Sequence, residues 1–148
     1  MSVVTRLFKN EDLQQIDNFL VLYEQLGYPT TKEELLGRLE KLNKHDDYYM
    51  LLLINEEGEV IGFSGMIHMM NFEKPGHYLR ILAFVVNSHY RKQGNGRLLL
   101  NESEQLAHKL DCEALALNSG NREERLNAHA FYQANGFNKK SLGFVKQL

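Results

Sequence analysis

Several features that mark membrane, secreted or nucleic-acid-binding proteins are missing from this sequence. No uninterrupted apolar run approaches the roughly 20 residues that a bilayer-spanning helix needs. Residues 1–10 show no basic stretch followed by an apolar core, so no secretion signal is predicted. The 17 Lys and Arg residues nearly balance the 19 Asp and Glu residues, and the net charge of −2 gives no strong basic footprint for phosphate backbones. We therefore expect a soluble cytoplasmic protein that binds neither membranes nor nucleic acids.

Cysteine is nearly absent as well. Cys112 is the only cysteine, which excludes an internal disulfide and any zinc site built from several cysteines. The six histidines include no pair four residues apart, so their spacing predicts no metal site. We expect most of them to be surface or hydrogen-bonded groups, and Cys112 to be a small core residue rather than a nucleophile.

What the sequence does contain is the composition of an ordinary globular protein. Its 148 residues are 43% hydrophobic and 24% charged. A chain of this length buries roughly 70% of the surface that its unfolded form exposes. No internal repeat, low-complexity tract or linker interrupts it, so residues 1–148 are expected to form a single domain.

The first half of the chain is predicted to form two helices and an antiparallel meander. Apolar residues at helical spacing follow Asn10, a candidate N-cap, and stop before Gly27, which places a helix at about 11–26. Thr31 and Glu34 have the spacing of a capping box, so a second helix follows directly. Runs rich in β-branched and aromatic residues predict strands over 3–8, 48–54, 60–70 and 78–86.

In the second half, helical patterns alternate with short strands. Glycine signals separate these elements, and Gly136 is placed to end the last helix in the left-handed conformation. The predicted elements are, in order, a basic loop at 91–97, a helix reaching Leu110, a strand at 113–117, a helix at about 121–135 and a strand at Phe144–Val145.

The loop at 91–97 is the first stretch that points to chemistry. Gly94 and Gly96 let the backbone approach a ligand closely, and the first N–H groups of the following helix point outward unpaired. The helix dipole and the neighbouring basic side chains favour a phosphate or pyrophosphate there. On its own, the pattern is more often that of a tight turn with solvated basic residues. It is neither a Walker A loop, which needs Gly-Lys before Ser or Thr, nor a dinucleotide fingerprint, because Leu99 stands where the third glycine belongs.

A second informative stretch covers residues 128–137. Phe131 and Tyr132 lie on one helical turn, and Phe137 follows the terminating Gly136. Taken alone, this is an ordinary amphipathic helix end in which the aromatic residues pack into the core.

The two stretches together resemble the GNAT superfamily of N-acetyltransferases. An Arg-x-x-Gly-x-Gly loop follows a Val-Val strand, and Phe-Tyr-x-x-x-Gly-Phe comes later, with Tyr132 about 36 residues after Gly96. The order of the other predicted elements also matches that family over nearly the whole chain. The resemblance implies an α/β fold of the α+β type. It would have a mixed, mostly antiparallel central sheet of about six to seven strands, splayed between the fourth and fifth, with about four flanking helices.

The resemblance also implies a site for acetyl-CoA as the acyl-donor cosubstrate. The backbone of the fourth strand would pair with the pantetheine arm, the loop would hold the pyrophosphate, and Tyr132 would be the general acid that protonates the leaving thiolate. The cofactor-binding residues implied in this way are Phe84, Val85, Val86, Arg91, Lys92, Gln93, Gly94, Asn95, Gly96 and Arg97, with Arg125 and Asn127 as further candidates.

The general base is harder to assign. Many relatives carry a carboxylate on the fourth strand shortly before the Val-Val pair, whereas residues 81–84 offer none. Glu73 and His77 are candidates for a base or a water relay, with His68 as a third.

The favoured reading is an N-acetyltransferase that moves an acetyl group from acetyl-CoA to a primary amine of a small molecule or peptide by direct transfer in a ternary complex. The alternative is a non-catalytic acyl-CoA-binding or sensing module, which the missing strand carboxylate keeps open. A phosphate- or nucleotide-binding protein is a third reading. The acceptor pocket would be lined by the first two helices and the loop at 71–77, with Tyr23, Tyr28 and Phe72 as aromatic walls, and the resemblance makes a homodimer possible.

Overall fold

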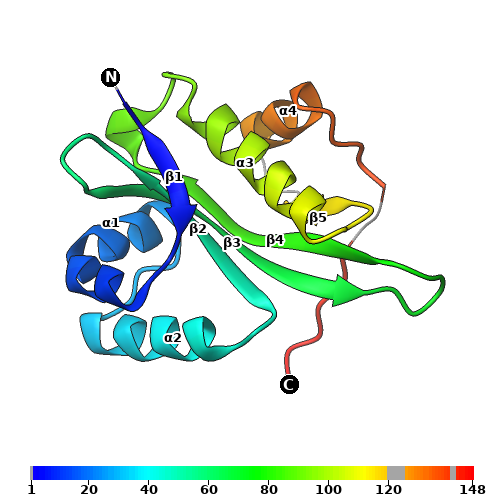
Figure 1. The fold of residues 1–148 in the computed structure, drawn as a ribbon, viewed down its shortest axis with the longest axis horizontal. Helices are drawn as coiled ribbons and strands as arrows, with labels where there is room; N and C mark the ends of the chain where they lie inside the picture. The colour runs from blue at the N-terminus through cyan, green and yellow to red at the C-terminus, as the bar shows by residue number, and fades with distance from the viewer. Residues whose placement is uncertain (1, 120–125, 141–142) are drawn as a thin grey trace. The chain divides into compact units, whose positions relative to one another are not determined.

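The computed structural model describes residues 2–119, 126–140 and 143–148 (Figure 1). The chain divides into two compact units, Met1–Ala116 and Leu117–Leu148. The second unit contains helix α4 (Leu126–Ala134), and strand β5 (Leu115–Leu117) spans the boundary. The remaining elements belong to the first unit. They are β1 (Val4–Leu7), η1 (Asn10–Gln15), α1 (Ile16–Leu26), α2 (Lys32–Lys44), β2 (Tyr48–Ile54), β3 (Val60–Met70), β4 (His77–Val86), η2 (Ser88–Tyr90) and α3 (Asn95–Lys109), where η marks a 3-10 helix.

The sheet follows the strand order β1-β2-β3-β4-β5 over the residues that the structure describes. β1 to β4 form an antiparallel meander, and β5 runs parallel to β4, which confirms the mixed, mostly antiparallel sheet. The prediction of six to seven strands is wrong, because the described sheet has five. Residues 143–148 contain no strand, and the exposed Phe144 and Val145 side chains bury no face there.

The predicted boundaries of β2 and β3 are confirmed, whereas the start of the first helix differs. The first turns form the 3-10 helix η1, and Lys9 rather than Asn10 takes the N-cap position. The reason is that the Asp12 carboxylate accepts a hydrogen bond of 2.7 Å from the Lys9 N–H. The other predicted signals are confirmed, since Thr31 Oγ1 accepts from the Glu34 N–H and Gly27 ends α1 with a φ of 100°.

Arg6 and Asp12 form an ion pair that joins β1 to η1. The two guanidinium nitrogens of Arg6 donate to the two oxygens of Asp12 at 2.9 Å and 2.7 Å. Burial alone would raise the pKa of Asp12, but the hydrogen bonds from Arg6 and the Lys9 N–H hold it below its ordinary value. The bidentate geometry makes this pair stronger than an ordinary surface ion pair.

Both faces of the sheet are covered by helices of the first unit. In Figure 1, α1 and α2 lie on one face and α3 on the other. The α1 and α2 face holds the main core, in which the Phe63 ring stacks on Tyr23 at 5.6 Å and lies 6.3 Å from Phe19. Fully burying a side chain of this kind contributes about 1.5–3 kcal/mol. On the other face, the buried Ser103 and Ser64 hydroxyls form a hydrogen bond of 3.0 Å that ties α3 to β3.

No helix in the described part of the chain is long and apolar enough to cross a membrane.

Candidate active site

β4 changes register in the middle, just before the residues expected to bind the donor. Ala83 pairs with Gly65 of β3 and Ile81 pairs with Met66, so Leu82 is an extra residue and forms a β-bulge. Leu82 is 55% exposed. The predicted donor strand follows directly, with Val85 and Val86 buried and Phe84 half-buried.

The loop between β4 and α3 is held closed by its own side chains. Arg91 Nε donates to the Val86 carbonyl at 2.9 Å, and Gln93 Nε2 donates to the His89 carbonyl at 3.4 Å. Asn95, which is buried, donates to the Tyr90 carbonyl at 2.9 Å. These three predicted ligand residues therefore fix the loop conformation through their side chains, and the Arg91 N–H is itself bonded to the Ser88 carbonyl.

Two residues of this loop, Lys92 and Gly94, lie in the left-handed region of backbone conformation, with φ values of 60° and 84°. Gly94 is the N-cap of α3 and has no side chain, so it offers no side-chain acceptor to the first N–H groups of that helix. A Cβ built on Gly94 would meet no protein atom within 4 Å, which shows open space beside the loop. An oxyanion fits this place, because uncapped N–H groups and the positive end of the helix dipole meet there.

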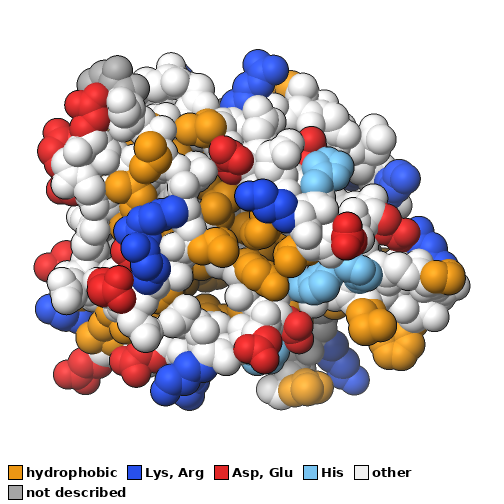
Figure 2. All heavy atoms as spheres, viewed as in Figure 1, with side chains coloured by type: hydrophobic (Ala, Val, Ile, Leu, Met, Phe, Trp, Pro, Cys, Tyr) orange, Lys and Arg blue, Asp and Glu red, His pale blue; other side chains and the backbone are white. Residues whose placement is uncertain are grey.

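The remaining predicted loop residues surround this place. Lys92 and Arg97 are exposed, and Gly96 lies half-buried in the first turn of α3. On the face shown in Figure 2, acidic and basic side chains are interspersed rather than gathered into areas of one sign.

A cavity of about 740 Å³ opens beside the β4 bulge. It lies between the end of α1, the α1–α2 connection, α2 and the bulged part of β4. Tyr23 and Tyr28, two of the aromatic residues expected around an acceptor, line it, whereas the 71–77 loop does not contribute and Phe72 is fully exposed. The lining residues are Tyr23, Leu26, Gly27, Tyr28, Pro29, Thr30, Glu34, Arg38, Leu82 and Ala83.

Two charged residues of this cavity, Glu34 and Arg38, were missed by the sequence analysis. They lie four residues apart on α2, which places them on one face of the helix. The Arg38 guanidinium lies 5.7 Å from the centre of the Tyr23 ring, a cation–π distance. Burial raises the pKa of the Tyr23 phenol, and Arg38 acts in the opposite direction. The i, i+4 spacing was visible in the sequence, but nothing there indicated that the pair faces a cavity.

The predicted general acid, Tyr132, lies on α4 in the second unit. Its ring packs edge-on against Phe131 and Phe137, with ring centres 5.5 Å and 5.9 Å away. Gly136 ends the helix with a φ of 91°, as predicted. Tyr132 is half-buried and Asn127 is exposed, while Arg125 lies outside the described residues.

The base candidates lie at the opposite end of β4 from the predicted donor strand. His77 is the first residue of β4 and precedes Phe84 by seven positions, or about 24 Å along an extended strand. Glu73 is exposed in the loop before it. His68 Nε2 lies 2.6 Å from His77 Nδ1, and the two rings pack edge-on. Leu82, at the bulge, follows His77 by five positions, or about 17 Å along an extended strand, which argues against direct contact between His77 and an amine at the bulge.

The sequence matches a known protein family over most of its length. The family model described as Acetyltransferase (GNAT) family matches residues 13–137, which is most of the chain. The chain belongs to the GNAT acetyltransferase family. No curated protein is similar enough to count as a match.

Solved structures of GNAT acetyltransferases resemble this one closely. A GNAT family acetyltransferase from Staphylococcus aureus is 47% identical, with a TM-score of 0.89 and 100% of both chains covered. Glucosamine-6-phosphate N-acetyltransferase from Arabidopsis thaliana is 20% identical, with a TM-score of 0.79 and 99% of both chains covered. A transcriptional regulator from Bacillus halodurans is also 20% identical, with a TM-score of 0.83 over 99% of this chain and 100% of that one. At 20% identity these two similarities show the fold alone.

Proposed function

We propose that this GNAT protein is an acetyl-CoA-dependent N-acetyltransferase that acts on a primary amine of a small molecule or peptide, with residues 1–148 working as one acetyltransferase domain. The observation that carries the proposal is the loop between β4 and α3. Its side chains bond inward, and its backbone presents an uncapped helix N-terminus to open space. That arrangement suits the pyrophosphate of acetyl-CoA.

The donor would lie along the end of β4. Backbone groups of Phe84, Val85 and Val86 would pair with the pantetheine arm, and the N–H groups from Gly94 to Arg97 would hold the pyrophosphate. The exposed side chains of Lys92 and Arg97 would add positive charge around it. Contacts from Arg125 and Asn127 remain predictions.

The cavity beside the bulge is the proposed acceptor site. Leu82 and Ala83 line it, and they directly precede the proposed donor strand, so an amine bound there would be close to the acetyl group. Its volume of about 740 Å³ suits a small molecule or the end of a peptide. The Glu34 carboxylate would attract an ammonium group, while Tyr23 and Tyr28 would form aromatic walls.

The chemistry requires three proton movements around a direct transfer: one from the ammonium before attack, one from the adduct nitrogen and one to the leaving sulfur. The neutral amine attacks the thioester carbonyl, a C–N bond forms, and the C–S bond breaks to release a thiolate. We propose that the Tyr132 phenol gives its proton to that sulfur and regains one through water as the adduct nitrogen loses its extra proton and becomes the amide. The ammonium proton must leave before attack, and we propose that water in the solvent-open cavity takes it beside Glu34. Because His77 lies about 17 Å before Leu82 along β4 and Glu73 lies in the loop before His77, we do not propose that either touches the amine.

The test compares binding with transfer. Acetyl-CoA should raise the melting temperature, ATP should not, and thiol should be released from acetyl-CoA only when an acceptor amine is present. Polyamines, amino acids, amino sugars and peptides form the acceptor panel. The non-catalytic acyl-CoA-binding module, the second candidate, predicts the same melting shift with no thiol release. An equal shift with ATP and acetyl-CoA would point instead to a general phosphate-binding protein.

A further inference from the structure

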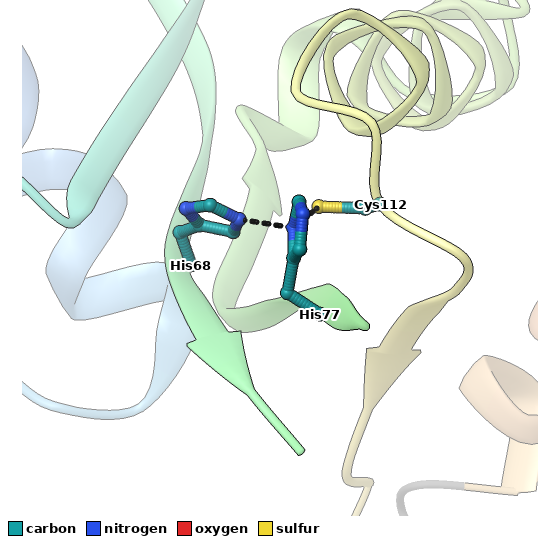
Figure 3. A group of neighbouring side chains, drawn as sticks. All are labelled: His68, His77 and Cys112. Carbon is teal, nitrogen blue, oxygen red and sulfur yellow. Dashed lines mark hydrogen bonds between the residues drawn. The ribbon is translucent and has the colours of Figure 1, made fainter. Parts of the chain in front are cut away.

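A second group of reactive side chains lies at the far end of β4 from the proposed donor site. His68 comes from β3, His77 begins β4, and Cys112 lies between α3 and β5 (Figure 3). All three are half-buried, and the proposed acetyl transfer uses none of them. Sequence spacing did not indicate this group, because the three residues meet only through the fold.

The register of the sheet explains why the two histidines meet. His68 pairs with Leu79 of β4, so His77 is its diagonal neighbour on the same face of the sheet. Such diagonal neighbours lie within reach of ring side chains. The Cys112 segment is held beside them because the Glu113 N–H donates to the His77 carbonyl at 2.9 Å. Asp111, with a φ of 57°, turns the chain at this point.

The distances suit a common metal ion. His68 Nε2 lies 2.6 Å from His77 Nδ1, Cys112 Sγ lies 3.7 Å from the same nitrogen, and the three ligand atoms all lie within 4.8 Å of one another. In a tetrahedral zinc site, bond lengths of about 2.1 Å to nitrogen and 2.3 Å to sulfur put ligand atoms roughly 3.3–3.6 Å apart. Small side-chain rotations would therefore bring all three atoms onto one ion.

The donor set selects the class of metal. Two imidazole nitrogens and one thiolate suit Zn²⁺ and other borderline-soft ions, whereas Mg²⁺ and Ca²⁺ prefer oxygen ligands. The nearby Glu113 carboxylate is already bonded to Asn71 and paired with Lys74. A fourth position would thus fall to water or to a small exogenous ligand.

The thiol would have to lose its proton to serve as a ligand. Burial raises the pKa of Cys112, and the neighbouring Asp111 raises it further, so the metal-free protein keeps the thiol protonated. A bound cation reverses this balance, and the displaced proton goes to solvent. Without metal, the imidazole pair shares one hydrogen bond, which the ion would replace.

We propose that His68, His77 and Cys112 form a zinc-binding site that joins the β3–β4 hairpin to the turn after α3. Because it ties together segments that are distant in the sequence, the ion stabilises the first unit. It takes no part in acetyl transfer, since His77 lies about 24 Å from Phe84 along β4.

The experiment uses the full chain without a histidine tag, stripped with chelator and then titrated with Co²⁺ and Zn²⁺ as chloride salts. Co²⁺ should give one equivalent of binding, a thiolate-to-cobalt charge-transfer band and the intense d–d bands of four-coordinate geometry, and Zn²⁺ should displace it. Zn²⁺ at about 100 times its Kd should raise the melting temperature by roughly 5–10 °C. The Co²⁺ spectrum of the wild-type protein needs no variant, so the absence of the charge-transfer band would overturn the proposal outright.

Variants then assign the ligands. Losing a residue that only hydrogen-bonds to a metal ligand lowers metal affinity by about 10–100-fold. Because Cys112 and His68 would be ligands themselves, Cys112→Ser and His68→Asn should each weaken Zn²⁺ binding by at least about 100-fold. His108→Ala, which removes an exposed histidine from α3, is the matched control and should bind as wild type does. Wild-type affinity in Cys112→Ser, or an equal loss in His108→Ala, would show that the metal binds elsewhere. Circular dichroism of each variant separates loss of the site from loss of the fold.

Discussion

The variant Gly94→Ala tests the proposed binding role of the β4–α3 loop separately from the stability of the fold. Gly94 has a φ of 84°, and a Cβ there would meet no protein atom within 4 Å. The substitution therefore creates no clash in the free protein and leaves only backbone strain. In the proposed complex, the same Cβ would occupy space that the pyrophosphate needs.

Gly58 provides a matched control, because it has a φ of 79° in the β2–β3 turn and the same open surroundings. Placing a non-glycine residue in this conformation costs about 1–2 kcal/mol. Both variants should therefore lower the melting temperature by a similar amount, about 2–8 °C for a chain of this size.

The two variants should differ in donor binding. A hydrogen bond to a charged group contributes about 1.5–3 kcal/mol, so losing one N–H contact with phosphate in Gly94→Ala should weaken acetyl-CoA binding by about 10- to 150-fold. Gly58→Ala should bind acetyl-CoA as the wild-type protein does. Isothermal titration calorimetry measures both. If Gly94→Ala binds within twofold of Gly58→Ala, the loop is not the pyrophosphate site.

Three further predictions concern the proposed catalytic groups and the Arg6–Asp12 pair. Tyr132→Phe keeps the ring that packs against its neighbours, so it should leave acetyl-CoA binding nearly unchanged and lower kcat by roughly 10- to 1,000-fold. If the variant has the wild-type kcat under conditions where the chemical step limits the rate, the phenol is not the general acid. Glu34→Gln should raise KM for a cationic amine about tenfold or more, whereas Glu73→Gln should keep the wild-type KM and pH–rate profile, both measured by steady-state kinetics. The reverse pattern would show that Glu73, and not Glu34, is the carboxylate that binds the amine. Asp12→Ala should lower the free energy of unfolding by about 1–3 kcal/mol at pH 7. Because the folded-state pKa of Asp12 is lowered, this contribution is present above its unfolded pKa of about 3.9 and lost as pH falls through the folded value, so urea unfolding of wild type and variant should converge at low pH.

Local signals predicted the parts of the fold that local chemistry decides. β2 and β3 have the predicted bounds because two runs rich in apolar residues flank a turn at 55–58, which leaves few other pairings. The Thr31 cap and the glycine that ends α1 are also decided within a few residues. The N-cap at Lys9 was missed because it depends on Asp12, whose carboxylate is held in place by Arg6 of β1.

The parts of the site that depend on local backbone conformation could be predicted from the sequence. The parts that form where segments distant in the sequence meet could not. The loop glycines and the Tyr132 helix stood out as motifs. The inward bonds of Arg91 and Asn95 depend on carbonyls that only the folded loop presents. The cavity charges on α2 depend on how that helix packs beside the β4 bulge, which no short motif encodes.

Detection of an N-acetylated amine tests the central claim most directly. The full chain would be incubated with acetyl-CoA and the acceptor panel, and products would be identified by mass spectrometry beside a parallel Tyr132→Phe reaction. We expect an N-acetylated product that requires the wild-type protein, with formation reduced roughly 10- to 1,000-fold in the variant. Acetyl-CoA binding with no acetylated product from any amine in the panel would contradict an acetyltransferase function and favour the acyl-CoA-binding module.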